Sequence, residues 1–189
     1  MRYSKKWPQY AKWWNDMQIK PSRAKEFDKL AQYAMEHSQP YRVVEDQTGV
    51  PWPMIACLHR RESDANFDTY LGNGDPLNRR TTHVPTGRGP FASFEEGAID
   101  ALELDGLTKV IDWRLEKIMY YWEIFNGAGY DAHGIPSPYL WGATNIQVPG
   151  KYVADGVWSS VAMDRQPGCC PLLKALMKLD PSIEYKRED

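Results

Sequence analysis

The sequence predicts a mainly helical protein of the α+β class that carries one small β hairpin. Two observations support this fold class. In most of the chain, apolar residues recur at the spacing of an amphipathic helix, in segments that end at proline or glycine. One stretch, residues 67–90, breaks this periodicity and is rich in glycine and proline. The length of 189 residues fits a single domain over residues 1–189.

The first predicted helices are separated by a proline. Ser22 is a candidate N-cap for a helix that runs to Ser38, and Pro40 is expected to end that helix. The next helix, Tyr41–Gly49, is expected to stop at its glycine. Further helices are predicted over Pro53–Ser63, after Ser93, over Thr108–Phe125 and over Leu172–Leu179.

Two of these helices carry a more specific signal. Ser93 is followed by Glu96 at the capping-box position, which predicts that a helix starts there. The long helix over residues 108–125 has one apolar face, which we expect to lie in the core. That face consists of Ile111, Leu115, Ile118, Met119, Trp122 and Phe125, and Trp113 on the same helix is also expected to be a core residue.

Residues 67–90 are the expected place of the β hairpin. The segments Thr69–Leu71 and Thr81–Val84 have the composition of short strands and are separated by turn residues. Residues 130–168 contain many glycines, prolines and aromatic residues. We therefore expect an ordered loop with short helical turns in that part of the chain.

The two ends of the chain are less regular. The first twenty residues contain Trp7, Trp13 and Trp14, and the sequence leaves open whether they form a docked helix or an exposed contact surface. The charged tail over residues 184–189 is expected to be frayed.

Composition excludes several classes of protein. A net charge of -2, from 23 basic and 25 acidic residues, does not favour a nucleic-acid binder with a broad basic face. No apolar run is long enough to span a membrane, and the N-terminus lacks the apolar segment of a secretory signal. The three cysteines have no disulfide or zinc spacing, and we predict neither a metal nor a cofactor. We expect a monomer.

Glu62 is the strongest candidate for catalysis. It lies at the end of the apolar helix 53–63, directly before the glycine-rich stretch, where a carboxyl group would lie between core and cleft. Partial burial raises the pKa of a carboxyl group, and a protonated carboxyl can act as a general acid. The alternative is a structural Glu62 that pairs with Arg60, Arg61 or Arg88. His59 and Glu62 could also share a metal, although a purely structural role is favoured.

Two segments resemble a known family. Ile55–Phe67 resembles the segment in which lytic transglycosylases and goose-type lysozymes place a catalytic Glu at a helix end, followed by Ser. Phe125–Tyr130 is similar to the segment that these enzymes place opposite that Glu, after a long helix. The resemblance covers about residues 51–168. It implies a lysozyme-like fold, with Glu62 as the general acid and Asn126 as a contact for an N-acetyl group; the alternative for Asn126 is a helix cap.

A further resemblance concerns phage-type lysozymes, which carry Glu, Asp and Thr across a small hairpin. Asp75 and Thr81 keep the six-residue separation of that family, although the gap from Glu62 to Asp75 is longer. The resemblance implies that Asp75 holds a water for attack and that Thr81, or Thr82, orients it. Asp75 is alternatively a turn residue only, and Asp64 and Asp68 are reserve candidates.

The aromatic surplus supplies candidate sugar contacts. Aromatic residues make up 13% of the chain, and Tyr and Trp rings stack on sugar faces while their polar atoms bind hydroxyl groups. Arg88, between two glycines, contacts substrate or pairs with Glu62, and His83 is expected to be an ordinary loop residue. The loop residues predicted to contact sugar are Tyr130, Tyr139, Trp141 and Tyr152.

Three further segments look like uncharacterised phage and prophage endolysins: Thr82–Phe91, Ser137–Trp141 and Gly150–Gly156. The resemblances together imply a muramidase that cleaves the β-1,4 bond between N-acetylmuramic acid and N-acetylglucosamine in bacterial peptidoglycan. They also imply synthesis in the host cytoplasm and action on the cell wall after release. The alternatives are a lytic transglycosylase or chitinase-like hydrolase, and a non-catalytic glycan-binding or virion structural module.

Overall fold

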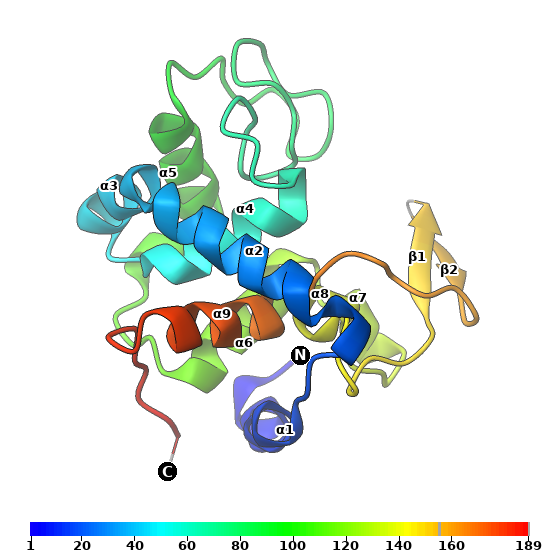
Figure 1. The fold of residues 1–189 in the computed structure, drawn as a ribbon. Coiled ribbons are helices and arrows are strands. Elements are labelled where there is room, and N and C mark those ends of the chain that lie inside the picture. Colours follow the sequence, from blue (N-terminus) through cyan, green and yellow to red (C-terminus); the bar gives the residue numbers. More distant parts are fainter. Residues whose placement is uncertain (155, 189) are drawn as a thin grey trace. The chain divides into compact units, whose positions relative to one another are not determined.

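The structure is a computed structural model that describes residues 1–154 and 156–188 (Figure 1). The chain divides into two compact units. One unit consists of Met1–Gln32 together with Arg114–Asp189, and the other of Tyr33–Trp113. Most regular structure is helical and the sheet has two strands, so the predicted fold class is confirmed.

The unit Tyr33–Trp113 is built around a helix that is buried on nearly all sides. This helix, α4, contains an almost continuous apolar run, and the side chains from Trp52 through His59 are all buried. A helix that is apolar all round lies inside a protein rather than on its surface. α3 packs against both α4 and α5. The bounds are α3 Ser38–Thr48, α4 Trp52–Ser63, α5 Phe94–Leu104 and the 3₁₀ helix η2 Leu107–Lys109.

The helix starts and stops follow local chemistry in most places. Gly49 ends α3 in the left-handed conformation with φ 71°, as predicted. The capping box of α5 is also confirmed, because the Ser93 side chain accepts a hydrogen bond from the N–H of Glu96. Glu96 in turn accepts a bond from the N–H of Ala92 at 2.7 Å.

The first predicted helix boundary was wrong. The 3₁₀ helix η1, Pro21–Arg23, precedes α2, Ala24–Glu36, and Lys20 rather than Ser22 takes the N-cap position of η1. The chain breaks at His37, and Pro40 lies in the first turn of α3 instead of ending α2. Proline is tolerated there because the first-turn N–H groups have no partner within the helix.

The hairpin was predicted in the wrong place. Within residues 67–90, all of which the structure describes, the β pairing consists of one isolated bridge between Thr69 and Pro76. The two-stranded antiparallel sheet lies in the segment that was expected to be loop. It pairs β1, Lys151–Ala154, with β2, Val157–Ser159. The same segment also contains the short helices α7, Gly129–Ala132, and α8, Pro138–Trp141.

In the unit that holds both termini, the Trp-rich N-terminal segment is a docked helix. This helix, α1, spans Tyr3–Asp16, buries Tyr10 and Trp14, and packs against α6, Leu115–Phe125. Four residues of the predicted core face of α6 are buried, Leu115, Ile118, Met119 and Trp122, whereas Phe125 and the preceding Trp113 are half-buried. Ile111 is 98% exposed, however, because the helix starts four residues after it. The last helix, α9, spans Cys169–Leu179 and packs on α8.

The C-terminal tail is anchored rather than frayed. The N–H of Leu115 donates to the carbonyl of Lys186 at 2.9 Å. The fully buried carboxylate of Glu116 pairs with Arg187 and accepts the N–H of Glu188 at 3.0 Å. These contacts close the first turn of α6, whose N–H groups lack partners within the helix.

Two further findings concern the described residues as a whole. No helix among them has the length and apolar character needed to cross a membrane. The three cysteines are buried, and Cys57 lies within α4 as a small apolar residue, as predicted.

The tail anchor gives a first testable prediction. Arg187→Ala removes the cation beside the buried Glu116 carboxylate, so the free energy of unfolding is expected to fall by about 2 kcal/mol. Chemical denaturation measures this change. Lys186→Ala is the matched control, because the exposed Lys186 contributes its backbone carbonyl to the anchor. Equal stability of Arg187→Ala and the control would contradict the anchoring role.

Candidate active site

Glu62 is the penultimate residue of α4 and is half-buried. The helix before it is a rigid part of the core, since the side chains over Trp52–Leu58 are buried. Glu62 therefore stands where the buried helix reaches the beginning of the long loop to α5. This is the position between core and surface that the sequence predicts for it.

The helix ends through a strained turn directly after Glu62. Asp64 and Ala65 both have left-handed backbone conformations, with φ values of 55° and 59°. For residues with a Cβ atom, this costs roughly 1 kcal/mol each. The N–H of Ala65 donates to the carbonyl of His59 at 3.1 Å, which satisfies one of the last carbonyls of the helix.

His59 connects the helix to the loop that follows Glu62. Its imidazole is fully buried, contacts the Tyr41 hydroxyl through Nδ1 at 2.8 Å, and contacts the carbonyl of Asn66 through Nε2 at 2.9 Å. A carbonyl only accepts, so Nε2 carries the proton and Nδ1 accepts the Tyr41 hydroxyl. Burial lowers the pKa of His59 to about 4, against a smaller opposing effect of the Asn66 carbonyl. Both nitrogens are used, which leaves neither for a metal.

The loop returns to the end of α4 at Gly74. This glycine has φ 76°, and a Cβ atom placed on it would lie 2.9 Å from the carbonyl oxygen of Glu62. A side chain is therefore excluded for two reasons, the backbone conformation and the close approach. Gly74 consequently lies directly against the backbone of Glu62.

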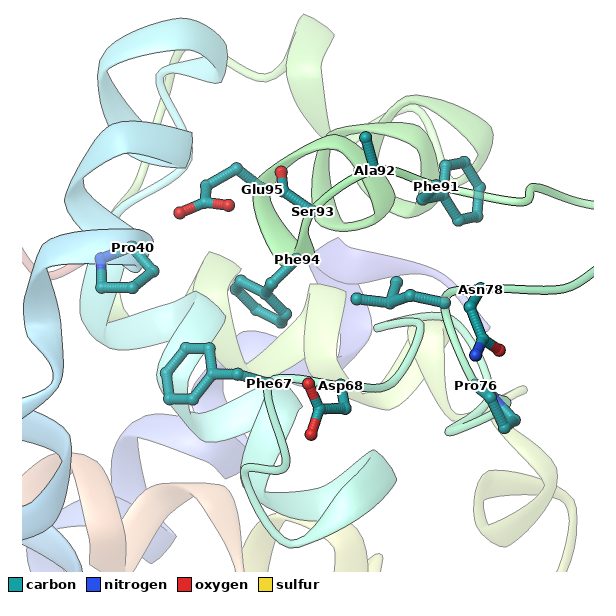
Figure 2. Close-up of a pocket in the computed structure, with 11 residues that line it drawn as sticks. Pro40, Phe67, Asp68, Pro76, Asn78, Phe91, Ala92, Ser93, Phe94 and Glu95 are labelled. Carbon is teal, nitrogen blue, oxygen red and sulfur yellow. The ribbon is translucent and has the colours of Figure 1, made fainter.

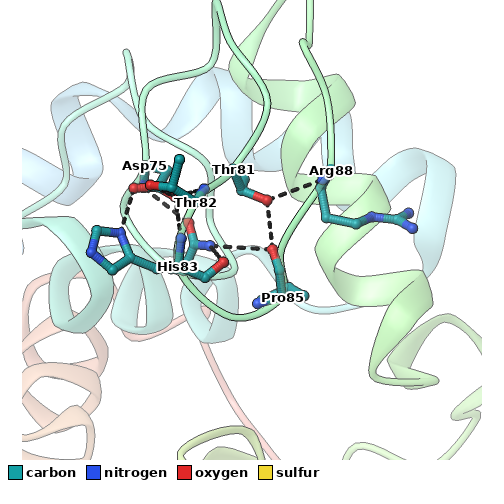
Figure 3. A network of polar contacts seen from close by, with 7 residues as sticks. Asp75, Thr81, Thr82, His83, Pro85 and Arg88 are labelled. Atoms are coloured by element: carbon teal, nitrogen blue, oxygen red, sulfur yellow. Dashed lines mark hydrogen bonds and ion pairs between the residues drawn. The ribbon is translucent and has the colours of Figure 1, made fainter. Parts of the chain in front are cut away.

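Asp75 is the centre of a polar network in this loop (Figure 3). Its Oδ2 accepts the N–H of Thr82 at 2.7 Å and the N–H of His83 at 2.9 Å. Its Oδ1 contacts the His83 Nδ1 at 2.6 Å. The neighbouring Asn73 accepts the N–H of Asp75 and donates to the carbonyl of His83 at 3.0 Å. The structure thus gives Asp75 the turn-forming role that was one of its two predicted roles.

The network also sets the protonation state of Asp75. The N–H of His83 contributes most to lowering the pKa of Asp75 to about 2, against the effect of burial, with the imidazole of His83 and the N–H of Thr82 adding to it. The carboxylate is ionised at every pH where the protein would work, so Asp75 cannot donate a proton. A carboxylate of such low pKa is also a weak base.

The hydroxyl of Thr81 is engaged in the same loop. It donates to the carbonyl of Pro85 and accepts the N–H of Arg88 at 3.0 Å. The Thr81 side chain is buried, so its proton already has a partner within the protein. Thr81 holds the two ends of the segment 81–88 together, and its predicted role in orienting a water stays a prediction.

Arg88 pairs with Asp100 of α5. Its Nε donates to the Asp100 carboxylate at 3.0 Å, and its Nη2 contacts the other carboxylate oxygen. The buried Tyr70 also donates to Asp100, at 2.8 Å. Arg88 therefore connects the end of the loop to α5. The sequence predicts a contact with substrate or with Glu62, whereas the structure gives Arg88 a structural role.

The remaining predicted site residues belong to the other unit. Asn126 is the C-cap residue of α6, and the buried Tyr130 lies on α7. Tyr139 and Trp141 are core residues of α8, with exposed fractions of 2% and 0%, so their rings are not on the surface where a sugar would bind. The structure therefore corrects the expectation that these aromatic residues lie in loops.

Tyr152 is half-buried on β1, within a cluster of aromatic rings. The ring of His133 stacks on that of Trp158 at 3.7 Å, and His133 Nε2 contacts the Tyr152 hydroxyl at 3.0 Å. Tyr130 makes edge contacts with Tyr152 and Trp158. Of the residues predicted to contact sugar, the structure therefore brings Tyr130 and Tyr152 together in this cluster.

A pocket of about 670 Å³ lies in the unit that contains Glu62. Figure 2 shows its Phe67 and Phe94 rings close together, with the carboxylate of Glu95 above them in that view and that of Asp68 below. Of the described residues that line the pocket, two are acidic and none is basic. The lining residues are Pro40, Phe67, Asp68, Pro76, Leu77, Asn78, Phe91, Ala92, Ser93, Phe94 and Glu95.

Among residues 1–154 and 156–188, no group of three His, Cys, Asp or Glu side chains is placed to hold a metal ion. Comparison with protein-family models, with curated proteins and with solved structures finds no match.

The buried His59 predicts an acid-sensitive stability. Because the folded pKa of about 4 lies below the ordinary value of 6.5, only the unfolded chain takes up the proton between these values. As the pH falls from 6.5 to 4, His59 is expected to lower the free energy of unfolding by about 3 kcal/mol.

Urea denaturation at several pH values measures this effect as the difference between the native protein and His59→Leu. The variant is less stable at pH 7, because Asn66 and Tyr41 lose their partner. Its stability depends less on pH between 6.5 and 4. An unchanged pH dependence in the variant would show that His59 is not the group responsible.

Proposed function

We propose that the protein hydrolyses the glycan strands of bacterial peptidoglycan, with Glu62 as the general acid. The observation that carries this proposal is the position of Glu62, half-buried at the end of the buried helix α4 and bordered by the loop at Gly74. A carboxyl group on a rigid helix beside a fixed loop can be held against a glycosidic oxygen.

The loop network supports the same proposal. Cleavage of a glycosidic bond with hydrolysis needs a second group that receives a proton or stabilises the developing positive charge. The ionised Asp75 and its partner His83 lie in the loop that packs against the Glu62 backbone. Unit Tyr33–Trp113 thus contains the proposed acid, Glu62, and an ionised carboxylate that is paired with an imidazole.

Peptidoglycan is the proposed substrate because of the resemblances of the segments around Glu62 and Asn126. These segments resemble segments of lytic transglycosylases, goose-type lysozymes and phage endolysins, and they follow one another in the same order along the chain. In this proposal the protein is made in the host cytoplasm and acts on the cell wall after release. A lytic transglycosylase on the same scaffold is the second candidate, since that reaction needs one carboxylic acid and no second protein carboxylate.

The pocket beside Phe94 is the proposed contact for further sugar units. The half-buried rings of Phe67 and Phe91 offer apolar faces to sugar rings, and the side chains of Asp68, Asn78 and Glu95 offer hydrogen-bonding groups to hydroxyls. Both features are typical of carbohydrate-binding sites, because a sugar has an apolar ring face as well as polar hydroxyl groups.

Glu62→Gln tests the proposed acid. The amide has nearly the same shape but cannot supply the proton, so the rate of release of reducing ends from purified sacculi is expected to fall 10²–10⁴-fold. Glu103→Gln, an exposed change on α5, is the matched control and keeps full activity. Equal rates for the native protein and Glu62→Gln would overturn the proposal.

Mass spectrometry of the products separates the two enzymatic candidates. Hydrolysis leaves free reducing muramic acid ends, whereas a transglycosylase leaves anhydro-muramic ends. Binding to sacculi without release of either product would identify a non-catalytic glycan-binding module.

Asn78→Ala tests the pocket. Asn78 is exposed at the rim, so its truncation is expected to leave the thermal midpoint unchanged. The loss of one hydrogen bond to substrate should raise the KM for soluble glycan oligomers about fivefold to tenfold while kcat stays the same. An unchanged KM would remove the Asn78 side of the pocket from the substrate path.

A further inference from the structure

His83 has an arrangement that the sequence does not reveal. Its side chain is 76% exposed, whereas the Asp75 carboxylate that holds it is 7% exposed. Nδ1 is fixed at 2.6 Å from Asp75 Oδ1, and no described residue makes a hydrogen bond with Nε2. One nitrogen of the imidazole is therefore anchored in the protein and the other is open to solvent.

The anchor determines which nitrogen carries the proton when the imidazole is neutral. The ionised Asp75 can only accept, so Nδ1 donates to it and Nε2 keeps a free lone pair. This is the tautomer in which an exposed Nε2 can accept a proton from a bound molecule. A carboxylate that orients an imidazole in this way is a recurring arrangement of enzymatic general bases.

The backbone of His83 is fixed as firmly as its ring. Its N–H donates to Asp75 Oδ2 at 2.9 Å, and its carbonyl accepts the side-chain amide of Asn73 at 3.0 Å. Asn73 precedes Gly74, which lies against the carbonyl of Glu62. The backbone of His83 is thus connected through Asn73 and Gly74 to the end of α4 where Glu62 lies.

We propose that His83 is the general base of the reaction and that Asp75 acts through it as a positioning residue. The inference rests on the proposed glycan hydrolysis. Asp75 is unsuited to take the proton itself, because its oxygens are occupied by the N–H groups of Thr82 and His83 and by the imidazole.

In the proposed step, His83 Nε2 removes a proton from a water molecule while the water oxygen forms a bond to the anomeric carbon. The bond between this carbon and the bridging oxygen breaks, and Glu62 gives its proton to that oxygen as it leaves. The products are two shorter glycan chains, one with a new hemiacetal of inverted configuration. Imidazolium and carboxylate then return to their starting states by proton exchange with water.

His83→Gly with added imidazole tests the base. On purified sacculi, kcat is expected to fall 10²–10⁴-fold with KM changed less than threefold, and imidazole in the assay should restore the rate at least tenfold. The same addition should not restore Glu62→Gln. The backbone N–H that binds Asp75 is retained in His83→Gly, and a thermal melt reports whether the loop is intact.

His83→Gln is the second variant, and it keeps a polar side chain at position 83. It should lose activity as His83→Gly does but without rescue, while the control His37→Gln, an exposed histidine of the same unit, keeps the native rate. NMR of the first-formed products of soluble oligomers should show the inverted anomer.

Three results would overturn the assignment of His83. These are a native kcat in His83→Gln, a folded His83→Gly that imidazole does not rescue, and a retained anomer or anhydro end in the products. A different pattern marks failure of the proposed function itself. In that case the native protein and Glu62→Gln release reducing ends at equal rates, or neither protein releases any. Either result would also exclude the proposed role of His83.

Discussion

The loop between α4 and α5 depends on one buried negative charge. Residues 67–90 contain one isolated bridge and no strand pair, so many of their backbone groups need other partners, and the Asp75 carboxylate accepts two of their N–H groups. The dependence is mutual, since an ionised carboxylate is tolerated inside a protein only when hydrogen bonds replace its hydration. The second closure of the loop, Thr81 with Pro85 and Arg88, uses the same kind of bond between side chain and backbone. A long irregular segment becomes a fixed surface in this way.

This fixed surface is joined to the core at the end of α4. On one side the buried His59 holds the carbonyl of Asn66, and on the other Gly74 allows the loop to approach the carbonyl of Glu62. The strained turn at Asp64 and Ala65 persists between these two contacts, because the surrounding structure determines it from both sides. Glu62 is consequently set between a rigid helix and a rigid loop. Such support is what holds a catalytic group in a productive position.

Local signals in the sequence were sufficient for several elements and insufficient for others. The capping box at Ser93, the stop at Gly49 and the apolar helix that ends beside Glu62 each depend on neighbouring residues and were predicted correctly. Several errors concern interactions between residues distant in sequence, such as the Glu116–Arg187 pair that anchors the tail. The link between Asp75 and His83 was missed for a related reason, because nothing in the local pattern shows that the loop folds back to bring them together.

The burial of Trp141 could not be predicted either, since aromatic residues in a segment rich in glycine and proline occur both in cores and on binding surfaces.

The hydrogen bonds to the Asp75 carboxylate explain why the proposed mechanism uses a carboxyl group as the acid and an imidazole as the base. In many glycosidases both groups are carboxyls, and their environments separate the two pKa values. Here the bonds that stabilise the ionised form of Asp75 lower its pKa to about 2 and make it a poor proton acceptor. Those bonds also fix the largely exposed imidazole of His83, whose Nε2 keeps a free lone pair when the ring is neutral. The carboxylate that fixes the loop therefore cannot accept the proton, and the proposed mechanism gives that role to the imidazole it holds in place.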